Sequence, residues 1–382
     1  MKKHIWMGAL CASLLMACSE KNASVERISN QNYEVVSDSI YTRMPGAILY
    51  QEGVVFWDDP MSFENFIHAV DVEKKTELVA FANKGEGPND FTATDISLDA
   101  DGGVVVYDLN KPLKIHYRIA DDKSNVYFEA DKYEIASQAT RLLCLDKDKT
   151  LSLCPEAEKM FQIKENDNVF SFGERPIKED VNNAYDIFQG QVAYNPQRRM
   201  LVYSNLVFPY LSVYKCSANQ DWSLVKELKE DWDYTISEGK LHFASVGKKC
   251  AMELALTEDY IVLLQRDTEV EESISKQEMR GRNVASLPRS LFVYDYDINT
   301  DQYIINENKF TKFNILYEIF YYYNDRYNYS LDSIEFDDND KSIIIIKLRD
   351  GNNFNITDFK IMKLTYNQLN IKMGKNPANI NQ

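Results

Sequence analysis

The sequence is short of the residues from which catalytic and metal centres are usually built. It holds 4 histidines and 6 cysteines in 382 residues, and no His-x-His, His-Glu-x-x-His or Cys-x-x-Cys spacing occurs. A local zinc signature is therefore absent, and we expect no metal and no cofactor. There is also no Gly-x-Ser-x-Gly elbow. An esterase-type serine nucleophile thus has no support from a motif.

Positive charge is scarce relative to negative charge. Lysine and arginine number 43 against 59 aspartates and glutamates, which gives a formal net charge of −16. Such a surface repels phosphate backbones, so a nucleic-acid partner is not expected. At 45% hydrophobic residues, with 24 tyrosines and 19 phenylalanines, the chain has enough apolar side chains to bury a sizeable core.

Only one long apolar run is present, and it lies at the N-terminus. Lys2 and Lys3 precede the run from Ile5 to Met16, which is too short for a permanent membrane helix. Leu15-Met16-Ala17-Cys18 follows, and a cysteine directly after Leu-x-Ala resembles the bacterial lipobox. We expect residues 1–17 to be a cleaved signal peptide and Cys18 to carry the lipid that attaches the chain to a membrane. The alternative is an ordinary signal peptide with an incidental cysteine.

The residues after Cys18 suggest a cellular location. Ser19 in place of aspartate resembles the outer-membrane choice in Gram-negative lipoprotein sorting, and Ser19-Glu20-Lys21 resembles the short surface-export tags of Bacteroidetes lipoproteins. We therefore expect an outer-membrane lipoprotein of the cell envelope, with its periplasmic or surface-facing orientation left open. Residues 18–32 are expected to form a flexible tether.

Four cysteines remain beyond the signal and the lipid site: Cys144, Cys154, Cys216 and Cys250. So few in a chain of this length do not form a disulfide scaffold, although an exported protein permits disulfides. Cys144 and Cys154 flank a predicted hairpin. Both a bridge between them and two free, packed thiols are compatible with that position.

A weak internal repeat is the most informative pattern in the chain. Each copy has an apolar strand end, a polar turn and a run of β-branched or aromatic residues, and the clearest copy runs from Ile96 to Asp108. The copies are anchored by Leu49, Leu98, Leu145, Tyr194, Leu256 and Phe336, at spacings of 49, 47, 49, 62 and 80 residues. A period near 45 to 50 residues with several short strands is typical of a four-stranded propeller blade. The sequence predicts an all-β, six-bladed β-propeller over residues 33–370, followed by a C-terminal tail, 371–382. A β-sandwich or barrel is the alternative.

The two longest spacings contain insertions. Residues 266–288 are charged and lack strand alternation, and residues 269–280 are the best candidate for a helix. Residues 310–329 are rich in aromatics, and Tyr321, Tyr322, Tyr323 and Tyr327 are candidate binding residues there. Tyrosine offers a flat apolar face and a polar tip, which suits contact with a sugar or a protein. The alternative is that these rings pack in the last blade.

One segment carries a family resemblance. Lys84-Gly85-Glu86-Gly87-Pro88-Asn89-Asp90-Phe91 resembles the Gly-x-Gly-Pro-Gly-Glu-Phe segment of the TolB-like six-bladed propeller lipoproteins of Bacteroidetes, with Asn89-Asp90 in place of Gly-Glu. The resemblance implies the propeller fold and an envelope address, and it implies no activity. Gly85, Gly87 and Pro88 are expected to form a structural turn between blades. A phosphate-binding loop is not expected because no Lys-Ser or Lys-Thr follows.

These patterns favour a binding or interaction module over an enzyme. A rigid propeller presenting variable loops suits an envelope protein or a glycan as partner. The alternative is an envelope hydrolase or lyase acting on carbohydrate or a related polymer, since paired carboxylates need to meet only in space. His68, His116 and His242 lining one site would resemble the metal centre of some propeller lyases. A purely structural lipoprotein is the third possibility.

Overall fold

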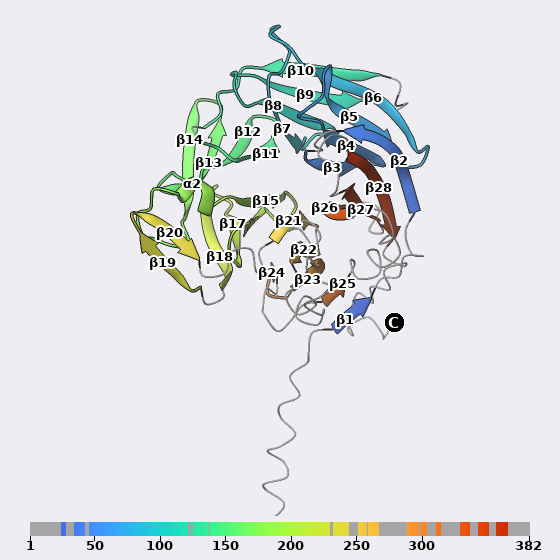
Figure 1. Ribbon diagram of the computed structural model, residues 1–382. Helices are drawn as coiled ribbons and strands as arrows, with labels where there is room; N and C mark the ends of the chain where they lie inside the picture. Colours follow the sequence, from blue (N-terminus) through green and yellow to red (C-terminus); the bar gives the residue numbers. More distant parts are fainter. Residues whose placement is uncertain are drawn as a thin grey trace, which may run out of the picture.

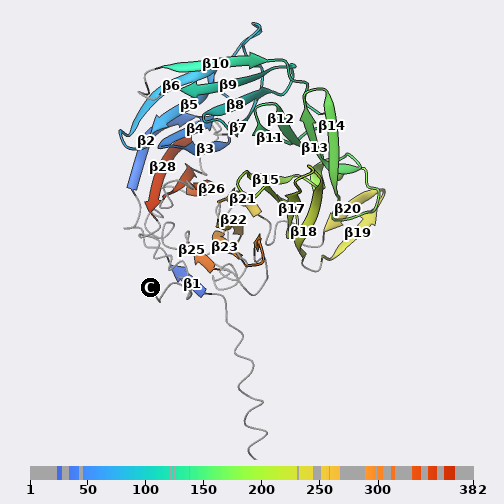
Figure 2. The same ribbon diagram turned by 180° about the vertical axis from the view of Figure 1, so that it is seen from behind.

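The computed structural model describes residues 46–303 apart from 121–122, 124, 137, 230–231, 244–250, 258, 267–288 and 298. Outside that range it describes the backbone of β1, β2 and β25 to β28. In this part of the chain, six sheets of at least four strands follow one another around a ring (Figures 1 and 2). No helix in it is long and apolar enough to cross a membrane.

The first four sheets are antiparallel and each uses four consecutive strands. The first has β3 (Ile48–Gln51), β4 (Val54–Asp58), β5 (Asn65–Asp71) and β6 (Thr76–Asn83). The second has β7 (Thr94–Leu98), β8 (Val104–Asp108), β9 (Lys114–Ile119) and β10 (Val126–Asp131). The third has β11 (Arg141–Asp146), β12 (Lys149–Leu153), β13 (Lys159–Glu165) and β14 (Asn168–Glu174). The fourth has β15 (Gly190–Asn195), β16 (Met200–Asn205), β17 (Tyr210–Cys216) and β18 (Trp222–Lys229).

The last two sheets recruit strands from the N-terminus. The fifth has β21 (Ala251–Leu256), β22 (Tyr260–Arg266), β23 (Arg289–Asp297), β24 (Gln302–Tyr303), β25 (Thr311–Asn314) and β1 (Ser24–Arg27). The sixth has β26 (Tyr329–Phe336), β27 (Ile343–Asp350), β28 (Thr357–Thr365) and β2 (Glu34–Thr42). β2 pairs antiparallel with β28, from Glu34 opposite Lys363 to Thr42 opposite Thr357. β2, from the N-terminal part of the chain, thus shares the sixth sheet with three strands from the C-terminal part.

The innermost strands close the ring. β3, β7, β11, β15, β21 and β26 each contact the next one in this order, and β26 contacts β3. Six sheets arranged radially in this way form a β-propeller, as the sequence predicts, and not a sandwich or a closed barrel. The expected tether, residues 18–32, contains β1, which pairs in parallel with β25.

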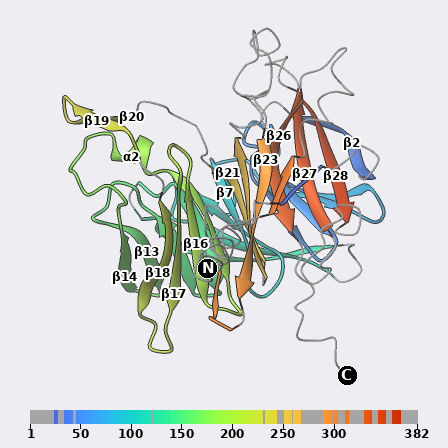
Figure 3. The ribbon, with the colours of Figure 1, turned by 90° about the horizontal axis from the view of Figure 1, so that it is seen from below.

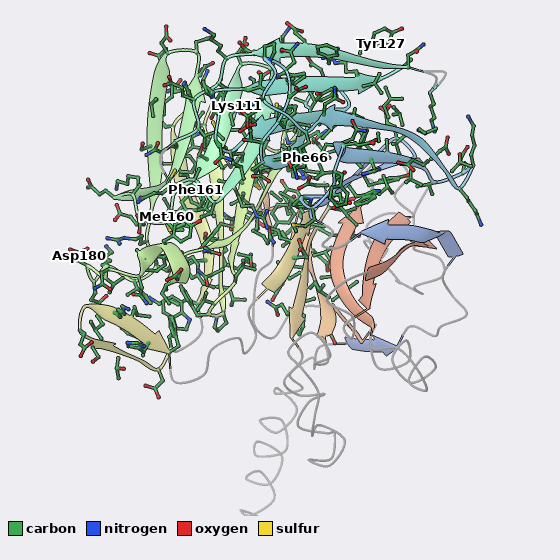
Figure 4. The ribbon with its side chains drawn as sticks, turned by 45° about the horizontal axis from the view of Figure 1, so that its top comes forward. Phe66, Lys111, Tyr127, Met160, Phe161 and Asp180 are labelled. Atoms are coloured by element: carbon green, nitrogen blue, oxygen red, sulfur yellow. The ribbon has the colours of Figure 1, made fainter. Side chains whose placement is uncertain are left out.

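The hydrophobic core lies between neighbouring sheets. The second strands β4, β8 and β16 are buried along their whole length, because both of their faces are covered by adjacent sheets. Phe56 and Phe66 of the first sheet join Val104 and Ile115 of the second in one cluster. The outermost strands are exposed by contrast, as Tyr127 on β10 shows at the periphery of Figure 4, with Phe66 and Phe161 in the interior.

Two further elements lie between sheets. The short helix α2 (Ala184–Ile187) interrupts the connection from β14 to β15. A two-stranded hairpin, β19 (Tyr234–Ser237) and β20 (Lys240–Phe243), follows β18. Figure 3 shows α2 and this hairpin together at one end of the strands. The helix expected at 269–280 falls outside the described residues.

Cys144, Cys154 and Cys216 are buried and free, so the structure contains no bridge between Cys144 and Cys154. Cys144 lies on β11 and pairs across the hairpin with Thr150, while Cys154 follows the end of β12. Burial raises the pKa of each of these two thiols to about 11. Both therefore behave as small apolar core residues and not as reactive nucleophiles.

Alkylation should distinguish the buried thiols of the folded protein from the same thiols after unfolding. With the thiol pKa at about 11, roughly one thiolate in a thousand is present at pH 8. We expect iodoacetamide at pH 8 to leave Cys144 and Cys154 unmodified in the folded protein and to modify both after unfolding without a reductant. Peptide mass spectrometry reads the two sites. Resistance to alkylation after unfolding, with a mass two hydrogens lower, would instead demonstrate a bridge.

Candidate ligand-binding cavity

A cavity of about 300 Å³ lies where the second, third and fourth sheets meet. Its lining includes the first residues of three innermost strands, Thr94 of β7, Arg141 of β11 and Gly190 of β15. Leu109 and Leu206, which follow the second strands β8 and β16, also line it. In an antiparallel pair, the start of one strand lies opposite the end of its partner. The starts of the innermost strands and the ends of the second strands therefore lie at the same end of the sheets.

Asp95 is the acidic side chain of the cavity, and its oxygens are engaged by the backbone. Oδ1 accepts a hydrogen bond from the N–H of Ile96 (3.0 Å), and Oδ2 accepts one from the N–H of Leu142 on the next sheet (3.0 Å). Burial raises the pKa of the Asp95 carboxyl above its usual value, against the lowering effects of the Arg141 guanidinium and of these two donors. Asp95 therefore fastens the second sheet to the third.

Arg141 is the basic side chain of the cavity. Its Nη1 lies 4.0 Å from Asp95 Oδ1, and its side chain remains 37% exposed while that of Asp95 is 12% exposed. This separation is an ionic contact and is too long for a hydrogen bond. Among the residues that the structure describes, none accepts a hydrogen bond from the Arg141 guanidinium. Its N–H donors are thus available to a ligand.

The connection from β14 to β15 supplies Tyr185 and Gln189 to the lining. This connection is braced by the β19–β20 hairpin. Asn183 Nδ2 donates to the carbonyl of Leu241 and Asn183 Oδ1 accepts from the N–H of Leu241, each at 3.0 Å. The N–H of Asn182 donates to the carbonyl of Gly239 at 2.9 Å. Tyr185 and Gln189 are therefore presented from a braced loop.

Three polar residues that were not predicted as functional organise the loops at the end of the sheets that holds the cavity. Asp58, Asp108 and Asn205 are the last residues of β4, β8 and β16, and all three are buried. Asp58 Oδ1 accepts from the Thr94 hydroxyl at 2.8 Å, which links the first sheet to the second. Their recurrence after a buried apolar strand, as in Val-Val-Phe-Trp-Asp and Val-Val-Val-Tyr-Asp, is the signal that could have identified them.

The segment with the family resemblance connects the first and second sheets. Gly85 N–H donates to the carbonyl of Phe91 (3.0 Å), and Gly87 N–H donates to Asp90 Oδ2 (3.0 Å). A Cβ at Gly85 or Gly87 would lie within 2.6 Å of Asp90 Oδ2, so a larger residue at either position would displace the Asp90 side chain. Lys111 Nζ donates to the carbonyl of Asp90. Pro88 lies between these contacts in the same turn.

The other candidate residues do not converge on this cavity. His68 and His116 lie on the third strands β5 and β9, and His242 lies on β20, so the three do not meet around the ring axis. His116 Nδ1 donates to Asp99 Oδ2 at 2.7 Å. Burial is the largest single effect and raises the pKa of Asp99, but the hydrogen bonds from His116 and the Asp101 N–H, together with the charges of His116 and Arg118, outweigh it, so the net shift is downward. No group of metal ligands occurs among the described residues.

Tyr321, Tyr322, Tyr323 and Tyr327 lie outside the described residues, as does Cys18. The expected aromatic site and the expected lipid site thus remain predictions. The cavity at the second, third and fourth sheets was not predicted, because its residues come from separate repeats.

Comparisons with known proteins return propellers at low similarity. No protein-family model matches the chain, and no curated protein matches it. The chain is similar to a solved member of the duf4221 family from Bacteroides vulgatus, at 12% identity and a TM-score of 0.47, covering 88% of this chain and 94% of that one. It is also similar to an auxiliary nutrient binding protein from Bacteroides ovatus, at 10% identity and a TM-score of 0.41, covering 90% and 76%.

A third similar structure is the WD40 repeat domain of RRP9, at 8% identity and a TM-score of 0.45, covering 89% of this chain and 99% of that one. The propeller assignment for the present chain rests on its own sheet order and on the closed ring of inner strands.

Proposed function

We propose that this protein is a ligand-binding β-propeller of the bacterial cell envelope, held at the outer membrane through acyl chains on Cys18. The cavity between the second, third and fourth sheets carries the proposal. Its lining combines the Arg141 guanidinium with uncharged polar groups and with Leu109 and Leu206, a composition suited to small polar ligands. The resemblance to TolB-like lipoproteins supports the envelope address, on either face of the outer membrane.

Binding is better supported than hydrolysis. Asp95 is the one carboxylate among the described residues that line the cavity, and both its oxygens accept backbone hydrogen bonds. Glycoside hydrolysis generally uses two carboxyl groups on opposite sides of the scissile bond. An arrangement of one engaged carboxylate and one available guanidinium instead suits retention of a ligand, with an envelope glycan or protein as its source.

Lipid attachment is tested by substituting Cys18. Cells expressing the full chain and given radiolabelled palmitate should incorporate label into the protein and retain it in the membrane fraction. Cys18→Ala should lose the label and the membrane retention that depends on it, because the Cys18 thiol is the proposed point of acylation. Cys11→Ala is the control and should behave as the unaltered chain. Equal labelling of the Cys18→Ala protein would contradict the proposed anchor.

Ligand binding is tested with the chain lacking residues 1–18, on a glycan array and in retention of envelope extract. Leu206→Trp places a large side chain at the cavity wall and should reduce retention at least about tenfold. Leu224→Trp on the outer strand β18, where Leu224 is 47% exposed, is the matched control and should change little. Retention that survives Leu206→Trp but is lost on joint substitution of Tyr321, Tyr322 and Tyr323 by alanine would move the site to the aromatic segment.

A further inference from the structure

The chemistry of the cavity depends on how the charge of Arg141, the one basic residue among the described lining residues, is balanced. Asp95 approaches Arg141 no closer than 4.0 Å, and each Asp95 oxygen is already occupied by a backbone donor. The neighbouring carboxylate therefore offsets part of the charge of Arg141 but uses none of its hydrogen bonds. A planar guanidinium in this state matches a carboxylate in bidentate geometry.

Because the Asp95 carboxylate already offsets part of the charge of Arg141, a ligand with several negative charges is disfavoured. A phosphate dianion would place two negative charges beside the Asp95 carboxylate, with one guanidinium to compensate for three charges. The net charge of −16 over the chain adds repulsion at long range. A ligand with one negative charge reduces both costs.

The remaining polar groups suit hydroxyls on the body of the ligand. The side chains of Tyr185 and Gln189 make no hydrogen bond with the residues that the structure describes, and Thr140 Oγ1 donates to the carbonyl of Leu153 only at 3.4 Å. A phenol, an amide and a weakly engaged hydroxyl can each donate or accept. Tyr185 is 41% exposed, so its ring is accessible to the apolar face of a sugar.

The volume limits how much of a ligand can enter the cavity. The part of a ligand inside the cavity has about 300 Å³, which is the space of on the order of ten waters at about 30 Å³ each. A single sugar ring with one substituent is of this size. The brace of Asn183 on Leu241 holds the loop with Tyr185 and Gln189 in place before binding, which reduces the ordering cost.

We infer that this cavity binds a sugar acid, with its carboxylate on Arg141 and its hydroxyls on the side chains of Tyr185, Gln189 and Thr140. The inference rests on the proposed function and narrows it to one ligand class. The sugar acid is a free monomer or the end of an acidic polysaccharide.

Titration calorimetry on the chain lacking residues 1–18 tests this with matched probes. Glucuronic and galacturonic acid are compared with glucose and galactose, and a galacturonic acid oligomer distinguishes a chain end from a free monomer. We expect at least one acid to bind more tightly than its neutral counterpart by about tenfold to a hundredfold, the range for hydrogen bonds to a charged group. Arg141→Gln should abolish that preference.

Two variants serve as controls. Arg118→Gln removes an exposed arginine that is paired with Asp101 on the surface, and it should leave the preference unchanged. Arg141→Lys keeps the charge but loses the bidentate geometry, so it should retain an intermediate preference and also serves if Arg141→Gln fails to fold.

Different outcomes test the sugar-acid assignment and the proposed binding function separately. Equal binding of acids and neutral sugars, or an acid preference that persists in both Arg141 variants, overturns the sugar-acid assignment and leaves the binding function standing. Stronger binding of inorganic phosphate or of N-acetylglycine than of either sugar acid overturns it as well. A chain that binds no probe and retains nothing from the glycan array or the extract contradicts the proposed function itself.

Discussion

Replacing Gly103 with alanine should destabilise the protein by about 4 kcal/mol or more, whereas Gly102→Ala in the same turn should cost about 1 to 2 kcal/mol. Both glycines have positive φ, +97° at Gly102 and +98° at Gly103, so the backbone strain of an added Cβ is shared. They differ in surroundings. A Cβ on Gly103 would lie 2.1 Å from the carbonyl oxygen of Tyr117 on β9, whereas nothing lies within 4 Å of one on Gly102.

The difference in unfolding free energy between Gly102→Ala and Gly103→Ala therefore measures the cost of steric overlap with the β9 backbone. Gly103 also donates its N–H to Gln51 Oε1 of the first sheet at 2.6 Å, so displacement of the turn would disturb the contact between the first and second sheets. Urea unfolding of the two variants, followed by tryptophan fluorescence, gives the free energies. Equal losses for Gly102→Ala and Gly103→Ala would show that the turn can move away from β9.

Asp108→Ala should cost about 3 to 5 kcal/mol of unfolding free energy. Asp108 is fully buried, and its carboxylate accepts from the N–H groups of Thr92 (2.6 Å), Asn110 (2.7 Å) and Lys111 (2.8 Å). Alanine would leave these three backbone donors without an acceptor. Asn205 serves the fourth sheet in a similar way, with its Oδ1 accepting from Val207 and Phe208.

Two further variants calibrate this effect. Asp108→Asn keeps one acceptor oxygen for Asn110 and Lys111 but turns an amide donor toward Thr92, so its loss should be intermediate. Asp101→Ala removes a carboxylate that is 53% exposed and paired with Arg118, and it should cost less than about 1 kcal/mol. Thermal and urea unfolding give the loss of stability of Asp108→Ala, Asp108→Asn and Asp101→Ala. A loss for Asp108→Ala similar to that for Asp101→Ala would mean that water replaces the carboxylate.

The repeat in the sequence proved a reliable guide to the blades. The six anchors all lie on the innermost strands: Leu49 is the second residue of β3, and the other five are each the last or next-to-last residue of their strand, namely Leu98, Leu145, Tyr194, Leu256 and Phe336. This agreement has a local cause, because an inner hairpin needs an apolar strand, a polar turn and a second apolar strand within about 12 residues. Two runs later in the fourth repeat, 211–216 and 223–228, likewise fall on the paired strands β17 and β18.

The amino-acid sequence by itself determined the strand pattern, the number of repeats and the shortage of local catalytic signatures, since each depends on neighbours along the chain. Tertiary structure alone decided which strand completes the sixth sheet, where β2 from the N-terminus pairs with β28. It also decided the cavity, where Asp95 of β7, Arg141 of β11 and Gln189 just before β15 line one space. The roughly 46 to 48 residues between these positions carry no trace of their proximity. Packing of the second, third and fourth sheets against one another brings them together, because contacts between sheets form between residues that the chain keeps far apart.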